Sequence, residues 1–224
     1  MKDIEYNDSY FRKRYLNDSK RLKSFAQEKK FVETYTNLMT NVCDIGCGTG
    51  EFLDYIDWKG NKYGTEVSGL AIREASKRFI TIVENVSNIR DNLDNVIMRG
   101  SLQHLPSPFE QIASVYQSLK PNGMFFILAT PNVDSLYYRI FEDLPALDFP
   151  KNYWLPGYRQ VKLVCEREGF ELVGKNFPYL DSGYATLFDF PKFILKCITR
   201  NDSIKFAFPG NMMNLAFRKK SPVL

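Results

Sequence analysis

The chain has few of the residues that build metal centres and disulfide frameworks. Its 224 residues include one histidine and four cysteines, and no two cysteines form a C-x-x-C pair. Without such a pair or further histidines, the sequence offers no zinc-ligand constellation. It therefore predicts no metal site, and it predicts free thiols in a reducing, cytoplasmic location.

Long apolar runs and a leader sequence are also missing. No apolar run reaches the ~18 residues of a membrane-spanning helix, and the charged N-terminus does not resemble a signal peptide. The chain has no internal repeat and no low-complexity tract. Its length suits one α/β domain with additions, so we expect residues 1–224 to form a single domain without a transmembrane segment.

The net charge of +4 is concentrated at the N-terminus. Residues 1–30 contain nine Lys and Arg against five Asp and Glu, and the rest of the chain is balanced. This segment is either a solvated helix face or a basic rim that attracts an anionic small-molecule acceptor. No basic stripe with interleaved aromatics runs through the chain, so no nucleic-acid partner is expected.

What the chain does contain is a glycine-rich loop between an apolar run and a helical pattern. In residues 42–50 (VCDIGCGTG), Asp44 closes the apolar run, and Gly46, Gly48 and Gly50 follow at every second position. Glycines spaced in this way let a strand-to-helix turn adopt positive φ, and they let a ligand approach the bare backbone. The loop is therefore a candidate site for a nucleotide-like cofactor.

Two acids indicate which kind of cofactor fits. Glu66 lies 22 positions after Asp44, near the expected end of the next strand, where an acid accepts hydrogen bonds from both ribose hydroxyls. The dinucleotide fingerprint G-x-G-x-x-G presents a helix N-terminus to a pyrophosphate, which Asp44 would repel. S-adenosylmethionine has an ammonium group and a ribose but no phosphate. The two acids therefore favour it over a nicotinamide cofactor.

Four segments, in order, resemble the class I S-adenosylmethionine-dependent methyltransferases. They are residues 44–50 with Glu66, residues 93–105 (LDNVIMRGSLQHL), residues 119–127 (LKPNGMFFI) and residues 130–132 (TPN). A lone glycine motif is also compatible with a structural turn, which the ordered downstream motifs disfavour. The resemblance implies an α/β fold: a Rossmann-like, doubly wound, seven-stranded mixed sheet, mostly parallel, with helices on both faces.

The resemblance also implies which residues hold the methionine end of S-adenosylmethionine, whose product is S-adenosylhomocysteine. Asp44 would lie near the ammonium group, directly or through water. The backbone of Gly46, Cys47, Gly48 and Gly50 would surround the same end, with Cys47 as a small residue that fills the loop rather than a nucleophile.

Further residues are expected around the rest of the cofactor. Glu66 would bind the ribose hydroxyls, and Val67 would pack on the adenine. Either Glu84 or Asn85, after the third strand, would meet the adenine amino group. Arg99, at the end of the fourth strand, would contact the methionine moiety through its backbone.

The only histidine, His104, follows the fourth strand by one short turn. It would face the same edge of the sheet as the glycine loop. A histidine has an unperturbed pKa of about 6.5, so it can take a proton from a hydroxyl acceptor near neutral pH. The alternative is that His104 packs and hydrogen-bonds to orient the loop or the substrate. Both interpretations stay open at this stage.

Alternating apolar and helical stretches divide the single domain into parts. We expect a helical cap at residues 1–36, a cofactor-binding core at 37–130, an aromatic-rich lid on the substrate side at 131–158, and the end of the sheet at 159–224 with an aromatic-rich insertion at 180–210. Strands are expected near residues 41–45, 62–66, 80–84, 95–99, 124–129, 170–175 and 213–218, and a helix near 158–168.

The aromatics of the lid allow two interpretations. They would stack on a sugar or another ring, or they would form an apolar cover, and in both cases they would lie over the acceptor. They are Tyr137, Tyr138, Phe141, Phe149, Tyr153 and Trp154. Which of the two they do is left open by the sequence.

The motifs look most like those of bacterial methyltransferases associated with surface-polysaccharide and sugar modification. This resemblance favours O-methylation of a sugar, a nucleotide-sugar or a similar small acceptor. One rival is methylation of a lipid or quinone-like acceptor, with the apolar 180–210 insertion in peripheral contact with a membrane. A rival of another class is a non-catalytic S-adenosylmethionine-binding module. The oligomeric state is not predicted.

Overall fold

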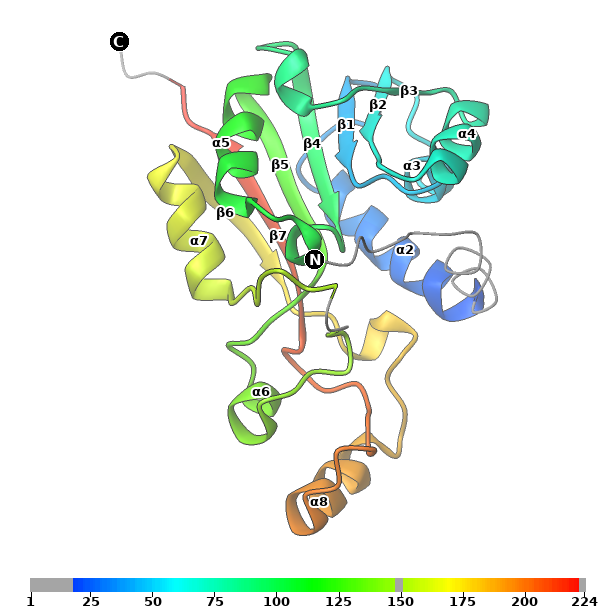
Figure 1. Ribbon diagram of the computed structural model, residues 1–224, viewed down its shortest axis with the longest axis vertical. Helices are drawn as coiled ribbons and strands as arrows, with labels where there is room; N and C mark the ends of the chain where they lie inside the picture. Colours follow the sequence, from blue (N-terminus) through cyan, green and yellow to red (C-terminus); the bar gives the residue numbers. More distant parts are fainter. Residues whose placement is uncertain (1–17, 148–150, 222–224) are drawn as a thin grey trace.

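A seven-stranded sheet forms the centre of the protein. The computed structural model describes residues 18–147 and 151–221. The strands are arranged in the order β3-β2-β1-β4-β5-β7-β6, which confirms the predicted Rossmann-like mixed sheet (Figure 1). They are β1 (Val42–Ile45), β2 (Lys62–Thr65), β3 (Ile80–Ile82), β4 (Leu93–Arg99), β5 (Leu119–Pro131), β6 (Phe170–Asn176) and β7 (Met212–Lys219).

The direction of the strands sets where their ends meet. Strands β1 to β5 pair in parallel, and β7 runs antiparallel between β5 and β6. Because parallel strands share one carboxyl edge, the loops after β1, β2 and β4 come together there, as ligand sites in open α/β sheets do. The glycine loop after β1 and the segment that follows Arg99 at the end of β4 are therefore neighbours at this edge.

The fifth strand is longer than predicted. It begins at Leu119 rather than near residue 124, and the Pro121-Asn122-Gly123 sequence, whose composition is typical of a turn, lies inside it. The pairing with β4 shifts register between Leu93 and Asn95, and Asn122 has a left-handed φ of 64°. These three residues therefore form a local irregularity within β5, rather than a turn that precedes the strand.

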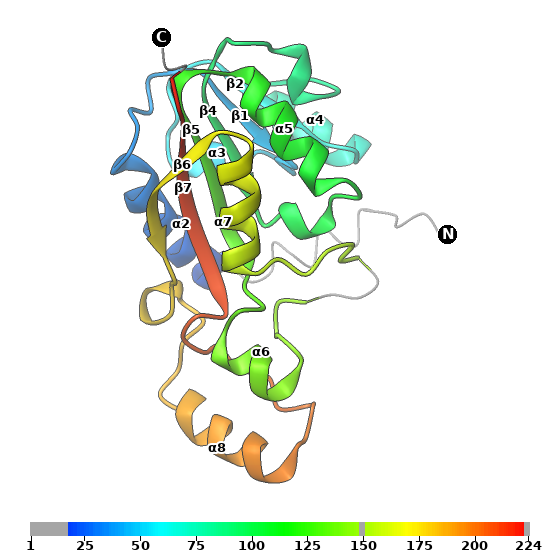
Figure 2. The same cartoon turned by 90° about the vertical axis from the view of Figure 1, so that its left-hand side faces the viewer.

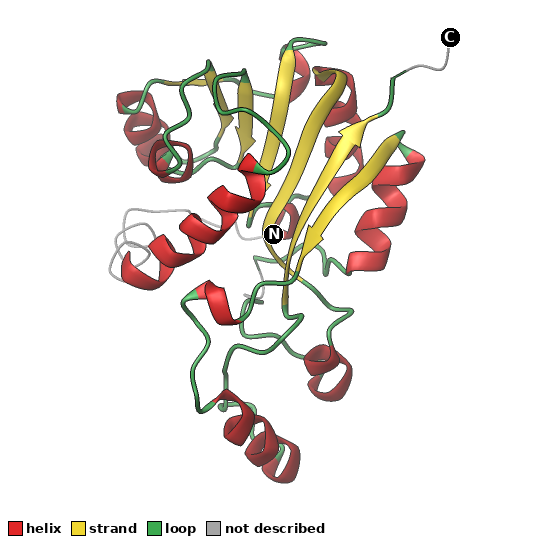
Figure 3. Cartoon of the chain, turned by 180° about the vertical axis from the view of Figure 1, so that it is seen from behind, coloured by secondary structure: helices red, strands yellow, loops and turns green. Residues whose placement is uncertain are grey.

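Helices cover both faces of the sheet, as predicted. The described residues form the helices α2 (Asp18–Glu33), α3 (Glu51–Tyr55), α4 (Gly69–Lys77), α5 (Pro108–Ser118), α6 (Leu136–Phe141), α7 (Tyr158–Arg167) and α8 (Asp189–Thr199), with short 3₁₀ turns η1 (Val86–Asn88), η2 (Leu102–His104) and η3 (Leu180–Ser182). Helices α5 and α7 lie on one face, and α2 and α3 lie on the other (Figures 2 and 3).

Strand β5 shows why two separate cores form. Phe125 and Ile127 belong to the core beneath α5 and α7, whereas Phe126 and Leu128 belong to the core beneath α2 and α3. Successive side chains of a strand point to opposite faces, so an uninterrupted apolar strand is buried on both sides. These four side chains are fully buried.

The predicted lid and the predicted insertion pack against each other beyond the end of the sheet. Tyr137 and Leu144 from the lid form a third core with Phe206 and Phe208 from the insertion. Helices α6 and α8 therefore form a layer below the sheet (Figures 1 and 2). Tyr137 is fully buried in this core, so it packs as apolar structure and presents no exposed ring for stacking.

The N-terminal cap is described in part. Helix α2 covers residues 18–33 of the expected 1–36, and residues 1–17 of the expected cap lie outside the described residues. Among the helices that the structure describes, none is long and apolar enough to span a membrane.

Candidate active site

The glycine loop connects β1 to α3 at the carboxyl edge of the sheet. Gly46, Gly48 and Gly50 all adopt left-handed φ values, of 74°, 55° and 79°. A side chain on Gly46 would clash with the Cβ of Ser101 at 2.8 Å, and one on Gly50 would clash with Ile80. A side chain on Gly48 would meet nothing within 4 Å. Gly46 and Gly50 are therefore required by packing, whereas Gly48 borders open space.

That space is a cavity of about 330 Å³, here called the loop cavity. Every residue that the sequence predicts as a cofactor ligand except Gly50 lines it. They are Asp44, Gly46, Cys47, Gly48, Glu66, Val67 and Arg99. Of the two alternatives for the adenine end, Glu84 lines the cavity, whereas the side chain of Asn85 instead caps η1 by accepting from the Ser87 backbone N–H.

Asp44 is the most perturbed acid of the loop cavity. Its side chain is 2% exposed, and its Oδ1 atom has no hydrogen-bond partner among the described residues. Burial raises the pKa of Asp44 to about 8, and the carboxylates of Glu66 and Glu28 add to the rise, while Arg99 opposes it. A buried carboxylate with an unused oxygen is stabilised by a cationic ligand group.

Asp44 precedes the glycine loop in β1, whereas Glu66 directly follows β2. The carboxylate of Glu66 connects the glycine loop to the end of β2 through hydrogen bonds. Its Oε2 accepts from the Gly48 N–H at 2.9 Å, and its Oε1 accepts from the N–H groups of Val67 at 2.7 Å and Ser68 at 2.9 Å. Glu66 thus orients the loop, and its carboxylate exchanges some of these bonds if it also binds a ligand hydroxyl.

The side chain of Arg99 does more than the sequence suggests. It forms a two-pronged ion pair with Glu28 of α2, at 2.5 Å (Nε to Oε2) and 3.1 Å (Nη2 to Oε1). The guanidinium also lies 4.4 Å from the ring centroid of Phe25 and 5.4 Å from that of Phe52. Burial raises the pKa of Glu28, and the charge of Arg99 acts against that rise. This pair fastens α2 over the end of β4.

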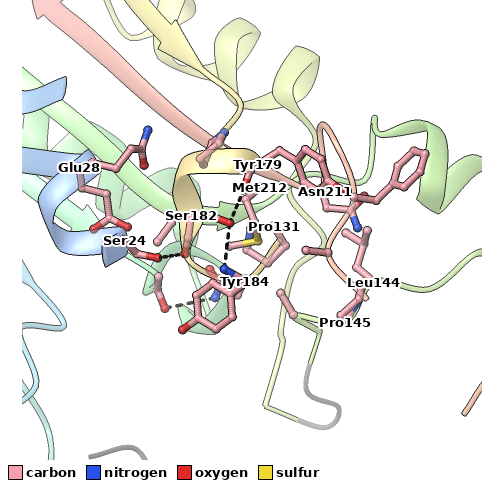
Figure 4. Close-up of a pocket in the computed structure, with 18 of the residues that line it drawn as sticks. Ser24, Glu28, Pro131, Leu144, Pro145, Tyr179, Ser182, Tyr184, Asn211 and Met212 are labelled. Carbon is pink, nitrogen blue, oxygen red and sulfur yellow. Dashed lines mark hydrogen bonds between the residues drawn. The ribbon is translucent and has the colours of Figure 1, made fainter. Parts of the chain in front are cut away.

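A second cavity of about 590 Å³, the lower cavity, lies between the sheet and the α6–α8 layer (Figure 4). Arg99, Gly100 and His104 line both cavities, so these residues form the boundary between them. Ser24 of α2 donates a hydrogen bond to the Ser182 carbonyl at 2.8 Å, which joins α2 to the insertion across the lower cavity.

Several amide groups that line the lower cavity lack hydrogen-bond partners within the described part of the chain. Both polar atoms of the Asn211 side chain are buried and unpartnered, and so are Nε2 of Gln27 and Oε1 of Gln103. Buried polar groups are normally hydrogen-bonded, and exceptions call for an explanation such as a missing ligand or water. Sequence reasoning singled out none of the three residues: Gln103 lies within the 93–105 segment but was given no role, and Gln27 and Asn211 belong to no motif.

The aromatics at the lower cavity differ from those predicted. Tyr179, Tyr184, Phe206 and Phe208 line it. Of the aromatics that the sequence favoured, Tyr138 and Phe141 pack with the third core, and Trp154 packs on Phe109 at 5.3 Å. Phe149 lies outside the described residues.

His104 lies at the boundary of the two cavities, and both of its ring nitrogens have partners. Nδ1 is 2.8 Å from the Lys151 carbonyl oxygen, and Nε2 is 3.2 Å from Nε2 of Gln103. A carbonyl only accepts, so Nδ1 carries the proton and Nε2 accepts from the Gln103 amide. Nε2 thus has the lone pair that a base needs, but an acceptor must displace Gln103 to use it.

Comparison with known proteins decides the family. A family model described as a methyltransferase domain matches residues 11–175 of this chain. The chain belongs to this methyltransferase family. It is an S-adenosylmethionine-dependent methyltransferase (EC 2.1.1). The predicted enzyme class and the predicted cofactor are thereby confirmed.

Solved structures of this fold are similar along nearly the whole chain. An S-adenosylmethionine-dependent methyltransferase from Archaeoglobus fulgidus has a TM-score of 0.64 at 20% identity and covers 95% of this chain and 100% of its own. One from Aquifex aeolicus has a TM-score of 0.62 at 16% identity, with coverages of 96% and 100%. A "possible histamine N-methyltransferase" from Thermotoga maritima has a TM-score of 0.61 at 18% identity, with coverages of 92% and 97%. No curated protein matches the sequence.

Proposed function

We propose that this methyltransferase O-methylates a sugar, a nucleotide-sugar or a similar small polar acceptor bound in the lower cavity. The observation that carries the proposal is a set of buried amide atoms without partners among residues that line this cavity: both polar atoms of Asn211, Nε2 of Gln27 and Oε1 of Gln103. Amides offer both donors and acceptors, which match the hydroxyl groups of a polyol. A purely apolar acceptor would leave these groups unsatisfied, at a cost of about 1–3 kcal/mol each.

The loop cavity fits S-adenosylmethionine on two structural grounds. The unpartnered oxygen of Asp44 suits a cation, and the open space at Gly48 leaves room for the ligand. We assign the methionine end to Asp44 with Gly46, Cys47 and Gly48, the ribose to Glu66, and the adenine end to Val67 and Glu84. Val67 is 83% exposed beside the cavity, so an apolar ring has free surface to cover there.

When bound, S-adenosylmethionine supplies a methyl group that its sulfonium already activates, so the protein contributes binding and orientation. The Arg99–Glu28 pair keeps α2 in place at the boundary between the cavities. His104 either accepts the acceptor's hydroxyl proton on Nε2 or holds the boundary in shape through Gln103 and Lys151.

Methyl-labelled S-adenosylmethionine and a panel of nucleotide-sugars test this proposal. The expected result is a labelled sugar product. Asn211→Ala should lower kcat/KM for that acceptor about tenfold, as the loss of one buried hydrogen-bonding group of about 1–1.5 kcal/mol does. Asn88→Ala, at an exposed asparagine far from the lower cavity's lining, is the matched control and should be neutral. An Asn211→Ala enzyme with unchanged kcat/KM would contradict the assignment.

A second candidate function is methylation of a lipid or quinone-like acceptor at a membrane surface. The observation in its favour is the exposed apolar face of α8, where Ile194 and Ile198 are 60% and 76% exposed. The same labelling assay with lipid extracts in vesicles discriminates it, since the label would then partition into the organic phase. No transfer to either panel, despite cofactor binding, would mean that the acceptor belongs to another chemical class.

A further inference from the structure

We propose that the outer face of α8 is a docking surface for a membrane that contains anionic lipids. The face, called the α8 face below, comprises Leu187 and Phe188 before the helix and Pro191, Ile194, Leu195 and Ile198 on it. All six are exposed. Their spacing of three and four residues places them on one side of the helix. The proposal concerns where the enzyme is held, and it is independent of which acceptor is methylated.

The inner side of α8 already has its partners, so the α8 face is not needed for folding. Phe193 stacks on Phe208 with ring centroids 4.6 Å apart. Lys196 is fully buried and donates to the Tyr137 hydroxyl at 3.2 Å. Asp189, the only acid of the helix sequence, is buried and accepts from Thr186. One side of the helix therefore joins the third core, and the opposite side is left in solvent.

The exposure of this face is large for residues of such apolar character. Leu187 is 95% exposed and Phe188 is 68% exposed, next to the isoleucines already described. Scattered apolar side chains on a surface need no explanation, whereas a contiguous patch marks an interaction site. Helix α8 lies at the end of the molecule farthest from β1 and β2 (Figures 1 and 2), and the six side chains of the face are exposed in the part of the chain that the structure describes.

Charge distinguishes a lipid surface from other occupants. Lys192 follows Pro191 of the face and forms no ion pair within the described part of the chain, whereas Arg200 donates to the Ile140 carbonyl at 3.1 Å and Lys205 lines the lower cavity. Two acids outside the helix, Asp143 and Asp202, each lie 3.9 Å from the buried Lys196. A helix with an apolar face beside an unpaired lysine and without exposed acids on it is typical of helices that lie in the interface of anionic bilayers.

Size argues against a second copy of the chain as the occupant. Stable protein–protein interfaces use roughly 20–30 residues on each side. The α8 face provides six residues on one short helix that projects from the molecule. A projecting helix buries little area against a rigid partner, but it can sink into the headgroup region of a bilayer.

Co-sedimentation of the full chain with vesicles tests the proposal. We expect binding to vesicles that contain phosphatidylglycerol, and weaker binding to vesicles of phosphatidylcholine alone or at high salt. Ile194→Glu/Ile198→Glu should lower the partition coefficient at least about tenfold, because each buried isoleucine contributes about that factor or more. Lys192→Ala should weaken binding to anionic vesicles specifically.

The matched control replaces two exposed apolar residues elsewhere, Phe79 and Leu163, which are 86% and 49% exposed. Phe79→Glu/Leu163→Glu should bind vesicles like the wild type. Absent binding, or binding that Ile194→Glu/Ile198→Glu leaves unchanged, overturns the proposal. So does a concentration-dependent dimer that this variant abolishes, since the face would then belong to a second copy. Calorimetry with S-adenosylmethionine on the same variants separates a failure of docking from a failure of the proposed function.

Discussion

The buried acid of the glycine loop leads to a prediction about pH. If Asp44 holds the ammonium group of S-adenosylmethionine, the ligand binds the ionised carboxylate. The pKa of Asp44 is raised to about 8 by burial, so in the ligand-free protein the carboxyl group is mostly protonated at neutral pH. Binding must then release that proton. The affinity for S-adenosylmethionine should therefore rise with pH until Asp44 is ionised in the free protein.

The size of the effect follows from that pKa. With a pKa of about 8, about one tenth of Asp44 is ionised at pH 7 and about nine tenths at pH 9, which predicts a Kd about tenfold lower at pH 9. Isothermal titration calorimetry in two buffers of different ionisation enthalpy measures both the affinity and the proton released. Release of close to one proton at pH 7 is expected.

Asp44→Asn is the control, because it keeps the size of the side chain and removes its titration. The variant should bind S-adenosylmethionine more weakly, and its affinity should not rise with pH through the ionisation of residue 44. The ammonium group of the ligand loses its charge at high pH, which lowers the affinity. The pH profile of the variant measures this decrease alone. If the wild type and Asp44→Asn showed the same pH profile and the same proton release, Asp44 would not be the partner of the ammonium group.

The same substitution should have the opposite effect on stability. A raised pKa means that the stabilising contribution of protonated Asp44 is complete below its ordinary value of 3.8 and is lost as pH rises to about 8. Asn cannot lose a proton, so ligand-free Asp44→Asn should melt at a higher temperature than the wild type at pH 8 and above. Thermal denaturation by circular dichroism at several pH values checks this sign.

Glu66→Ala should weaken S-adenosylmethionine binding by about 1.5–3 kcal/mol, the range for hydrogen bonds to a charged group, and unchanged affinity in a folded variant would remove Glu66 from the ribose site. Gly48→Val should abolish binding with near-native circular dichroism, because its side chain enters open space, whereas Gly46→Val should also lower the melting temperature through its clash with Ser101; normal binding by both would make the loop structural. Glu28→Ala should cost about 3–5 kcal/mol of unfolding free energy by stranding buried Arg99, as urea denaturation would report, and a neutral result would mean that the pair does not fasten α2. His104→Ala should lower turnover roughly 10²–10⁴-fold if His104 is the base, and near-normal turnover with an unchanged pH profile in His104→Gln would leave it an orienting role.

The lining of the loop cavity could be predicted from sequence because its signals are local. The positive φ at Gly46, Gly48 and Gly50 and the acid at the end of β1 follow from chemistry within a few residues. The position of Glu66 follows from the regular length of a βα unit. The apolar run of β5 is visible in the sequence. Its early start at Leu119 is not, because it depends on pairing with Leu93 of β4.

The lining of the lower cavity could not be predicted because it is built from distant segments. Gln27 and Asn211 are separated by most of the chain, and both line the lower cavity only because α2 crosses the sheet near the start of β7. Glu28 meets Arg99 across 71 positions of sequence. The aromatics around Tyr137 were visible, but nothing local shows that Phe206 and Phe208 bury them.

A crystal structure with S-adenosylhomocysteine tests the central claim most directly. The account predicts the ligand in the loop cavity, with its ammonium group at Asp44, its ribose hydroxyls at Glu66, and its sulfur toward the boundary formed by Arg99, Gly100 and His104. A ligand bound elsewhere would contradict the account. So would a ligand in the loop cavity whose sulfur faces away from that boundary, because the methyl group could not then reach an acceptor in the lower cavity.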